Sequence, residues 1–293
     1  MTLTPLLLAL LLGTGLVAGG IGALTGIGGG LLLIPTLVLG FGVPVRVAVS
    51  TSLVAVVATS NAAGSVYVGR GLTNMRLGMT LEIATTLGAI AGGISAAVVS
   101  EEVLAGAFAV LTLLTAGSLL VRGRREEPSP VQTALEEART EGEGRESVGR
   151  LAGAYLDPAA GRMVEYEATR LPVGLGASFL AGGVSGLLGV GGGFLKVPAM
   201  HLGMGVPVKV AAATSNFMIG VTAAASLVIY AQRGFLEPLV AAPVALGVAI
   251  GALAGTRLQA RASGRALVVV LAVLLVVGAV QMALKSAGVW VGG

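Results

Sequence analysis

Long apolar stretches alternate along the chain with short polar or glycine-rich interruptions. They form two groups of five on either side of a polar segment. The first group covers roughly 5–26, 29–41, 46–68, 77–99 and 102–121, and the second roughly 171–189, 193–204, 209–231, 236–256 and 266–284. Most stretches have about 20 residues, the length at which a helix crosses a hydrocarbon core of about 30 Å. The pattern predicts an all-α polytopic membrane protein.

The second stretch of each group is too short to cross. As helices, 29–41 and 193–204 would rise only about 18–20 Å, and each begins within a run of three glycines. Each short stretch is therefore predicted to pair with the stretch before it as a broken or re-entrant helical hairpin. Three full transmembrane helices then remain in each half.

The two groups are copies of one another. A shift of 163 positions aligns 16–93 with 179–256 without a gap, and 29 of the 78 pairs are identical. AGGIGALTGIGGGLLLIP matches AGGVSGLLGVGGGFLKVP, and GVPVRVA matches GVPVKVA. The chain is predicted to divide into membrane repeat 1 (1–121), a cytoplasmic connector (122–170) and membrane repeat 2 (171–293).

Arginines indicate the orientation of the two halves. Arg122, Arg124 and Arg125 open the connector, which the positive-inside rule places in the cytoplasm. If each half crosses the membrane an odd number of times, the halves have inverted topology, and a second arginine cluster (Arg257, Arg261, Arg265) also falls on the cytoplasmic side. We expect a multi-pass protein of the plasma (inner) membrane with two inverted repeats.

The connector has two parts. EEPSPVQTALEEARTEGEGRES is charged and poor in large apolar residues, so it is predicted to be flexible or weakly helical. AYLDPAAGRMVEYEATRL alternates residue types on both sides of a DPAAG turn, which predicts a small β-hairpin. The hairpin could cap the protein, contact a partner subunit or serve regulation.

Composition narrows the function. With 55% hydrophobic residues, 11% charged residues and a mean hydropathy of +0.94, a water-soluble fold is excluded. Basic residues stand singly at the edges of apolar stretches, so the net charge of +4 does not indicate a nucleic-acid partner. The chain has no cysteine and one histidine, which predicts no zinc site, and no cofactor is expected. Neither paired intramembrane aspartates nor an HExxH motif occurs, so we predict that the protein is not an enzyme.

The glycine runs are candidates for a binding site. Non-helical backbone inside a membrane survives only within protein or beside a watery cavity, and the free amides at a helix start favour an anion. If the helices restart at Leu31 and Phe194, these amides belong to the two runs, Gly28, Gly29, Gly30 and Gly191, Gly192, Gly193. The alternative is close helix packing, which we favour for Gly19, Gly20, Gly182 and Gly183.

Hydroxyl and amide side chains follow each break. They lie in apolar stretches that GVPV introduces: Thr51, Ser52 and Asn61 in the first repeat, and Thr214, Ser215 and Asn216 in the second. Such donors suit an oxyanion because they bind it without a fixed charge that would trap it. The alternative is hydrogen bonding between helices, and for Asn61 the binding role is weaker because its repeat partner is Ala224.

Three ionisable residues lie within or near apolar stretches, where charges are costly and often functional. Lys196 replaces Leu33 of the first repeat and could attract an anion, or it could reach to the cytoplasmic boundary. Glu82 and His201 are candidates for proton coupling, and an interfacial location is the alternative for both.

Two copies of G-x-G-G-G-(x4)-P, each followed by G-V-P-V-[RK]-V-A and T-S, resemble the TauE/SafE family of sulfite exporters and related sulfonate permeases. The resemblance covers both membrane halves. It implies an inner-membrane carrier for small sulfur or organosulfur anions such as sulfite, sulfoacetate or aryl sulfonates. Direction, native substrate and the role of Lys196 do not follow from it.

We therefore predict a secondary transporter that holds a small anion near the midplane and works by alternating access. An anion channel is the alternative, and a membrane scaffold without transport is a weaker one. The predicted partners are the small anionic substrate and the lipid bilayer, with no nucleic acid. Protons or another coupling ion, and a homodimer, remain open.

Overall fold

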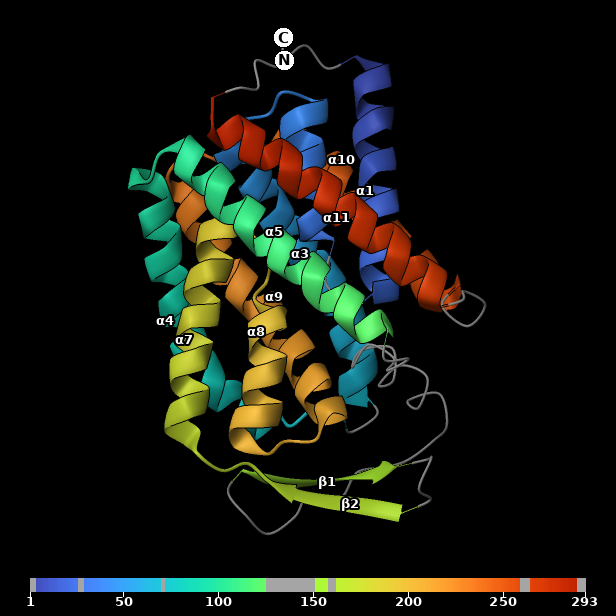
Figure 1. The fold of residues 1–293 in the computed structure, drawn as a ribbon, viewed down its shortest axis with the longest axis vertical. Helices are drawn as coiled ribbons and strands as arrows, with labels where there is room; N and C mark the ends of the chain where they lie inside the picture. Colours follow the sequence, from blue (N-terminus) through green and yellow to red (C-terminus); the bar gives the residue numbers. More distant parts are fainter. Residues whose placement is uncertain are drawn as a thin grey trace.

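The computed structural model describes residues 4–25, 29–69, 72–124, 151–157, 162–258 and 264–288. Nearly all of these residues are helical (Figure 1). The first half contains α1 (Pro5–Thr25), α2 (Gly30–Pro35), η1 (Thr36–Gly40), α3 (Val45–Gly69), α4 (Met75–Val98) and α5 (Glu101–Arg124).

The second half repeats this order. It contains α7 (Leu171–Leu188), α8 (Gly193–Pro198), η2 (Ala199–Gly203), α9 (Val208–Gln232), α10 (Pro238–Leu258) and α11 (Gly264–Ser286). Each element lies within a few residues of its predicted stretch.

Five helices in the described residues are long and apolar enough to cross a membrane: α1, α4, α5, α7 and α9. The helices α3, α10 and α11 have 25, 21 and 23 residues. Large apolar side chains such as Leu6, Ile83 and Leu114 are exposed on the outer surface, where a bilayer would cover them. The predicted all-α polytopic membrane protein is confirmed.

The short interrupted helices are also present. Six residues of α2 continue directly into five of η1, and α8 continues in the same way into η2. Eleven residues rise about 16 Å in a helix, too little to cross a bilayer. The π-helical turns begin after Pro35 and Pro198, where proline lacks the amide that an α-helix would use.

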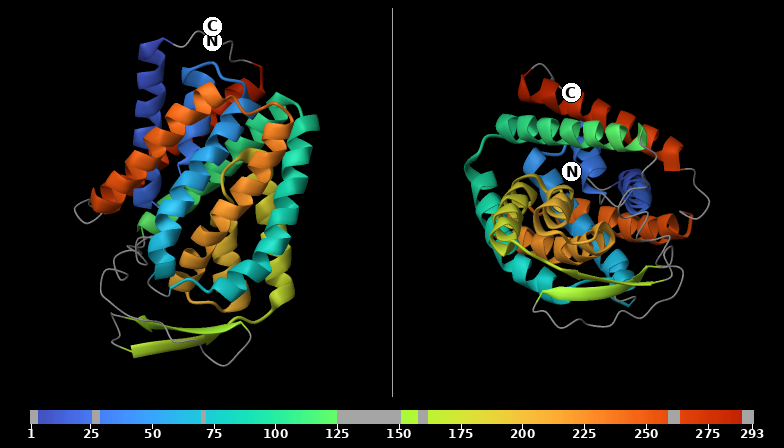
Figure 2. Two further views of the ribbon diagram at one scale, coloured as in Figure 1. Left: turned by 180° about the vertical axis from the view of Figure 1, so that it is seen from behind. Right: turned by 60° about the horizontal axis from the view of Figure 1, so that its bottom comes forward.

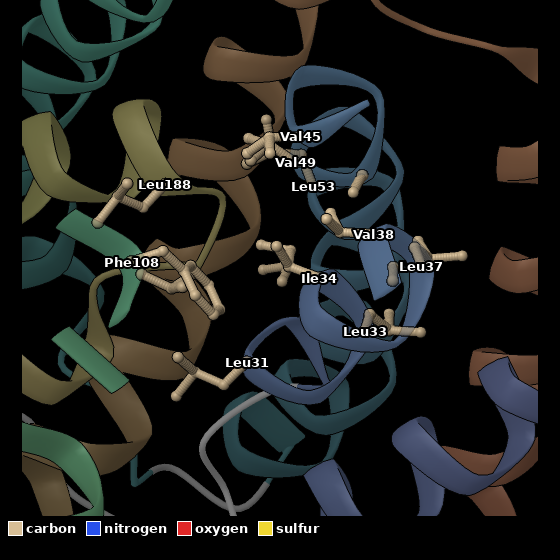
Figure 3. Packing of buried hydrophobic residues seen from close by; sticks show 14 of the residues in the cluster. Leu31, Leu33, Ile34, Leu37, Val38, Val45, Val49, Leu53, Phe108 and Leu188 are labelled. Carbon is tan, nitrogen blue, oxygen red and sulfur yellow. The ribbon is translucent and has the colours of Figure 1, made fainter. Parts of the chain in front are cut away.

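The first short helix lies inside the protein. Leu33, Ile34 and Leu37 have no exposed surface and belong to one buried cluster with Phe108 of α5. In Figure 3 the side chain of Ile34 faces Phe108. The buried side chains of this short helix therefore pack against protein and not against lipid.

The helices of the two halves pack closely against each other, α1 along α10 and α4 along α7. A Cβ on Gly88 would clash with the carbonyl oxygen of Phe179, and one on Gly92 with that of Gly183. Because the residue numbers of the contacts rise together along the two helices, α4 and α7 run parallel. The same progression, from Gly15 at Val244 to Gly19 at Val248, makes α1 and α10 parallel.

Equivalent residues of the two repeats make equivalent contacts. Gly19 meets the carbonyl of Val248, and its repeat partner Gly182 meets the carbonyl of Thr85, the repeat partner of Val248. The packing role predicted for Gly19 and Gly182 is confirmed. By contrast, Gly20 and Gly183 have room for a Cβ at ordinary contact distance.

The predicted β-hairpin is confirmed as an antiparallel pair, β1 (Ala152–Asp157) and β2 (Arg162–Glu167). It lies at the end of the bundle opposite to the first turn of α1 (Figures 1 and 2). Asn74 caps α4 through a bond from the Leu77 amide (3.0 Å), and its amide group donates to the Tyr166 hydroxyl of β2 (3.1 Å). The hairpin is thereby attached to the start of α4.

Replacing Gly92 with alanine should destabilise the protein because its Cβ would clash with the main chain of α7 and force the helices apart. We expect a loss of about 1–3 kcal/mol, seen as a lower melting temperature of the detergent-solubilised protein. Gly117→Ala is the matched control, because a Cβ there meets nothing within 4 Å. Equal melting temperatures for the two variants would contradict the close packing of α4 and α7.

Candidate functional site

The start of the first short helix, at Gly29 and Gly30, approaches the second glycine-rich break, residues 189–192 between α7 and α8. A Cβ on Gly30, in the first turn of α2, would lie 3.0 Å from the carbonyl oxygen of Gly189, which follows the last turn of α7. Val56 of α3 lies beside both breaks, 3.3 Å from that position on Gly30 and 3.2 Å from the equivalent position on Gly191. One helix of the first repeat therefore contacts both interruptions.

The second break depends on glycine conformations. Gly189, Gly191 and Gly192 have φ angles of +71°, +79° and +73°, a region in which side chains are strained. Gly192 caps α8, and a Cβ on it would lie 2.7 Å from the carbonyl oxygen of Ala181 in α7. This glycine is required both by its dihedral angles and by the closeness of α7.

The helices restart one residue earlier than predicted, at Gly30 and Gly193. The amides of Leu195 and Lys196 both donate to the Gly192 carbonyl at 3.2 Å. The amides of Gly193 and Phe194 precede these donors in α8 and have no acceptor within the helix. The first break differs in detail, because Gly29 caps α2 in the right-handed region.

Three serines surround the breaks. Ser52 of α3 donates to the Gly189 carbonyl at 2.8 Å, a bond between the two repeats. Ser215 Oγ of α9 lies 3.4 Å from the Cβ position of Gly193, and Ser185 Cβ of α7 lies 3.4 Å from that of Gly192. The hydroxyls of Ser185 and Ser215 are buried without a hydrogen-bond partner among the described residues. A buried polar group without a partner costs about 1–3 kcal/mol. The second break therefore has two hydroxyl groups that could still bind a ligand.

Lys196 and Glu82 lie together. They are the two buried charged side chains of the described part of the chain, 1% and 7% exposed. Lys196 Nζ donates to Thr222 Oγ1 of α9 at 2.8 Å, and Thr222 lies 2.8 Å from Glu82 Oε1 of α4. The direct distance from Lys196 Nζ to Glu82 Oε2 is 3.9 Å. A single polar network therefore joins α4, α8 and α9.

This network settles where Lys196 points. The side chain is buried beside Glu82 and does not reach the surface of the protein. Glu82 also accepts a bond from Thr86 one turn further along α4 (3.3 Å), while its Oε2 atom has no hydrogen-bond partner among the described residues.

The threonines and Asn216 lie in other contacts. Thr214 Oγ1 accepts a bond from the main-chain N–H of Asn74 at 3.0 Å, which links α9 to the start of α4. The Asn216 main-chain carbonyl accepts a bond from Ser60 of α3. Thr51 is fully buried, and its hydroxyl has no partner among the described residues.

No contact places the other predicted site residues in the described part of the chain beside the breaks. Asn61 of α3 is exposed, and so is His201 of η2, whose Nδ1 lies 2.9 Å from the Val206 carbonyl oxygen. The exposed position of His201 fits the interfacial alternative. Gly28 lies outside the described residues.

Two polar residues of this region were not predicted. Thr222 is one of the few polar residues of α9 that are identical in the two repeats, opposite Thr59, and this identity was a usable signal. Ser185 had no such signal, because its repeat partner is Gly22.

Comparison with known proteins identifies relatives over almost the whole chain. The family model described as Sulfite exporter TauE/SafE matches residues 11–282. A protein of Bacillus subtilis (strain 168), the probable membrane transporter protein YunE, is 27% identical over 240 residues, which cover 80% of this chain and 81% of the relative. No solved structure matches.

The Lys196–Glu82 network should behave as an energetic unit. Lys196→Met leaves a buried carboxylate without its cation, which typically costs about 3–5 kcal/mol. Adding Glu82→Gln removes that charge, so the double variant should recover much of the lost stability. Thermal unfolding of the two single variants and the double variant measures the coupling between the residues. Strictly additive effects would show that the two charges do not interact.

Proposed function

This chain belongs to the sulfite exporter TauE/SafE family of membrane transporters, and we propose that it carries a small sulfur oxyanion or organosulfonate. In this proposal the protein is a secondary transporter that works by alternating access. The anion binds between the two glycine-rich breaks near the midplane of the membrane.

One observation carries the proposal: interrupted helices from both halves meet inside the protein, beside buried hydroxyls that lack partners. Ser52 of the first half bonds Gly189 of the second, while Ser185 and Ser215 retain unused donors at Gly192 and Gly193. Amides at helix starts and hydroxyls bind oxyanions well. A sulfite or sulfonate group has three oxygens that could accept several of these bonds together.

The packing of the helices supports two inverted halves. With α1 parallel to α10 and α4 parallel to α7, the first helix of each half runs in the direction of the third long helix of the other. Halves of equal orientation would make these pairs antiparallel, if α1 and α4 cross in opposite senses. Inverted halves around a central site are a recurring plan of transporters that rock between inward-open and outward-open states.

Binding can be tested before transport. Purified protein should be stabilised by its substrate in a thermal-shift panel of sulfite, sulfate, thiosulfate, sulfoacetate, taurine and aryl sulfonates. A ligand at 100 times its Kd adds about 2.7 kcal/mol. If no anion of the panel raises the melting temperature, a scaffold without transport becomes the better description.

Flux in proteoliposomes tests the site. We expect Gly192→Ala to lower counterflow of the bound anion at least about tenfold, since the Cβ would enter the break, and strain at positive φ adds about 1–2 kcal/mol. Gly205→Ala is the matched control: its φ is +75°, but a Cβ there meets nothing within 4 Å. This variant should have the same backbone strain and should retain the wild-type flux.

Two results would contradict the proposal. Full transport activity of both Gly192→Ala and Gly30→Ala would show that the breaks do not form the binding site. Electrogenic flux that neither saturates nor exchanges would instead support the alternative, an anion channel.

A further inference from the structure

We propose that Lys196 is the cation that receives the transported anion, and that Glu82 competes with the anion for it, so that one proton is carried together with each monovalent anion. This inference rests on the proposed function and assigns the coupling ion of the same site.

The geometry shows a pair that is held apart. Lys196 Nζ and Glu82 Oε2 are 3.9 Å apart, longer than a charge-assisted hydrogen bond of about 2.7–2.9 Å. Thr222 lies between them and takes one of the three ammonium donors. Oε2 has no hydrogen-bond partner among the described residues. The two opposite charges are close enough to attract each other, but Glu82 Oε2 is left without a hydrogen bond.

The ammonium group lies near the second break. Side chains on a helix tilt toward its N-terminus, which directs Lys196 back toward Gly193. On α9, Ile219 packs against the Cβ positions of Gly191 and Gly193, and Thr222 follows three residues later on the same face. In this inference, an anion bound at the Gly193 amide lies on this face of α9, between Ser215 and the ammonium group at Thr222.

Other titratable groups lie farther from the pair or outside the packed region. The helix α7 contains no titratable side chain. Arg76 at the start of α4, His201 on η2 and Arg233 at the end of α9 are exposed. The Tyr230 hydroxyl of α9 donates to the Leu187 carbonyl at 3.1 Å. The side chain of Lys209 lies outside the described residues.

Charge balance fixes the stoichiometry. With Lys196 as an ammonium group and Glu82 as a carboxylate, the charges of the pair sum to zero. A monovalent anion alone would leave the site with a net charge of −1, which is unfavourable in a membrane interior. If Glu82 takes up a proton, the carboxyl group becomes neutral, the ammonium group is released to the anion, and the loaded site is again neutral. The proton and the anion then cross in the same direction without net charge movement.

Binding of an aryl sulfonate at different pH values tests this directly, because the charge of a sulfonate does not change between pH 5 and 8. For the wild-type protein, affinity should rise as the pH falls, by up to about tenfold per unit, the limit for one linked proton. Glu82→Gln should bind with the low-pH affinity at every pH. Lys196→Met/Glu82→Gln, which contains no buried charge at either position, should lose binding at least about tenfold while still folding.

Glu102→Gln is the matched control, because Glu102 is exposed at the start of α5. It should keep the wild-type pH dependence. In proteoliposomes, a pH gradient at zero voltage should drive accumulation of the anion by the wild-type protein and not by Glu82→Gln.

Each outcome has one meaning. An unchanged pH dependence in Glu82→Gln, wild-type affinity in the double variant, or electrogenic accumulation would overturn the inference. If the wild-type protein binds and exchanges no anion of the panel, the proposed function itself is wrong, and that result is visible before any variant is made.

Discussion

Main-chain groups that leave a helix inside a bilayer must find their partners within the protein, and the arrangement of this molecule depends on that constraint. Each half contains a helix too short to cross, preceded by a glycine-rich break. The short helix of the first half has Leu33 and Ile34 within the buried core. The second break receives a bond from Ser52 of the other half at the Gly189 carbonyl. The second break therefore depends on a hydroxyl group of the first half.

Glycine also determines how near the two halves come. The helices α4 and α7 touch main chain to main chain at Gly88, Gly92, Gly182 and Gly186. This contact sets the place of α7, whose Ala181 carbonyl bounds the break at Gly192, and of α4, which carries Glu82. A small increase in the separation of these helices would both open the break and lengthen the Glu82–Lys196 distance. The close packing of α4 and α7 therefore also determines the geometry of the polar site.

Much of this architecture was predictable from the sequence, because it follows from length and local pattern. The apolar stretches, the short helices after GGG and the DPAAG hairpin each have a local physical cause, and the structure confirms them. Contacts between residues far apart in sequence were not predictable. Lys196 and Glu82 were separate candidates, and Thr222, which joins them, was missed. Likewise, nothing local distinguishes Ser215, which lies at a break, from its neighbour Thr214, which bonds to Asn74.

The departures from the repeat explain what each half contributes. Thr59 and Thr222 are equivalent, yet Thr59 bonds to the carbonyl of Val56 in its own helix, whereas Thr222 links two charges. The difference arises because Leu33 stands opposite Lys196 and Ala245 opposite Glu82. A symmetric site would bury two cations and two carboxylates, with a desolvation cost for every one. A single pair is enough to balance one monovalent anion and one proton. In the proposed carrier, the first half thus supplies the carboxylate of Glu82 and the second supplies the cation of Lys196, and the asymmetry keeps the buried charge at the minimum that the proposed coupling requires.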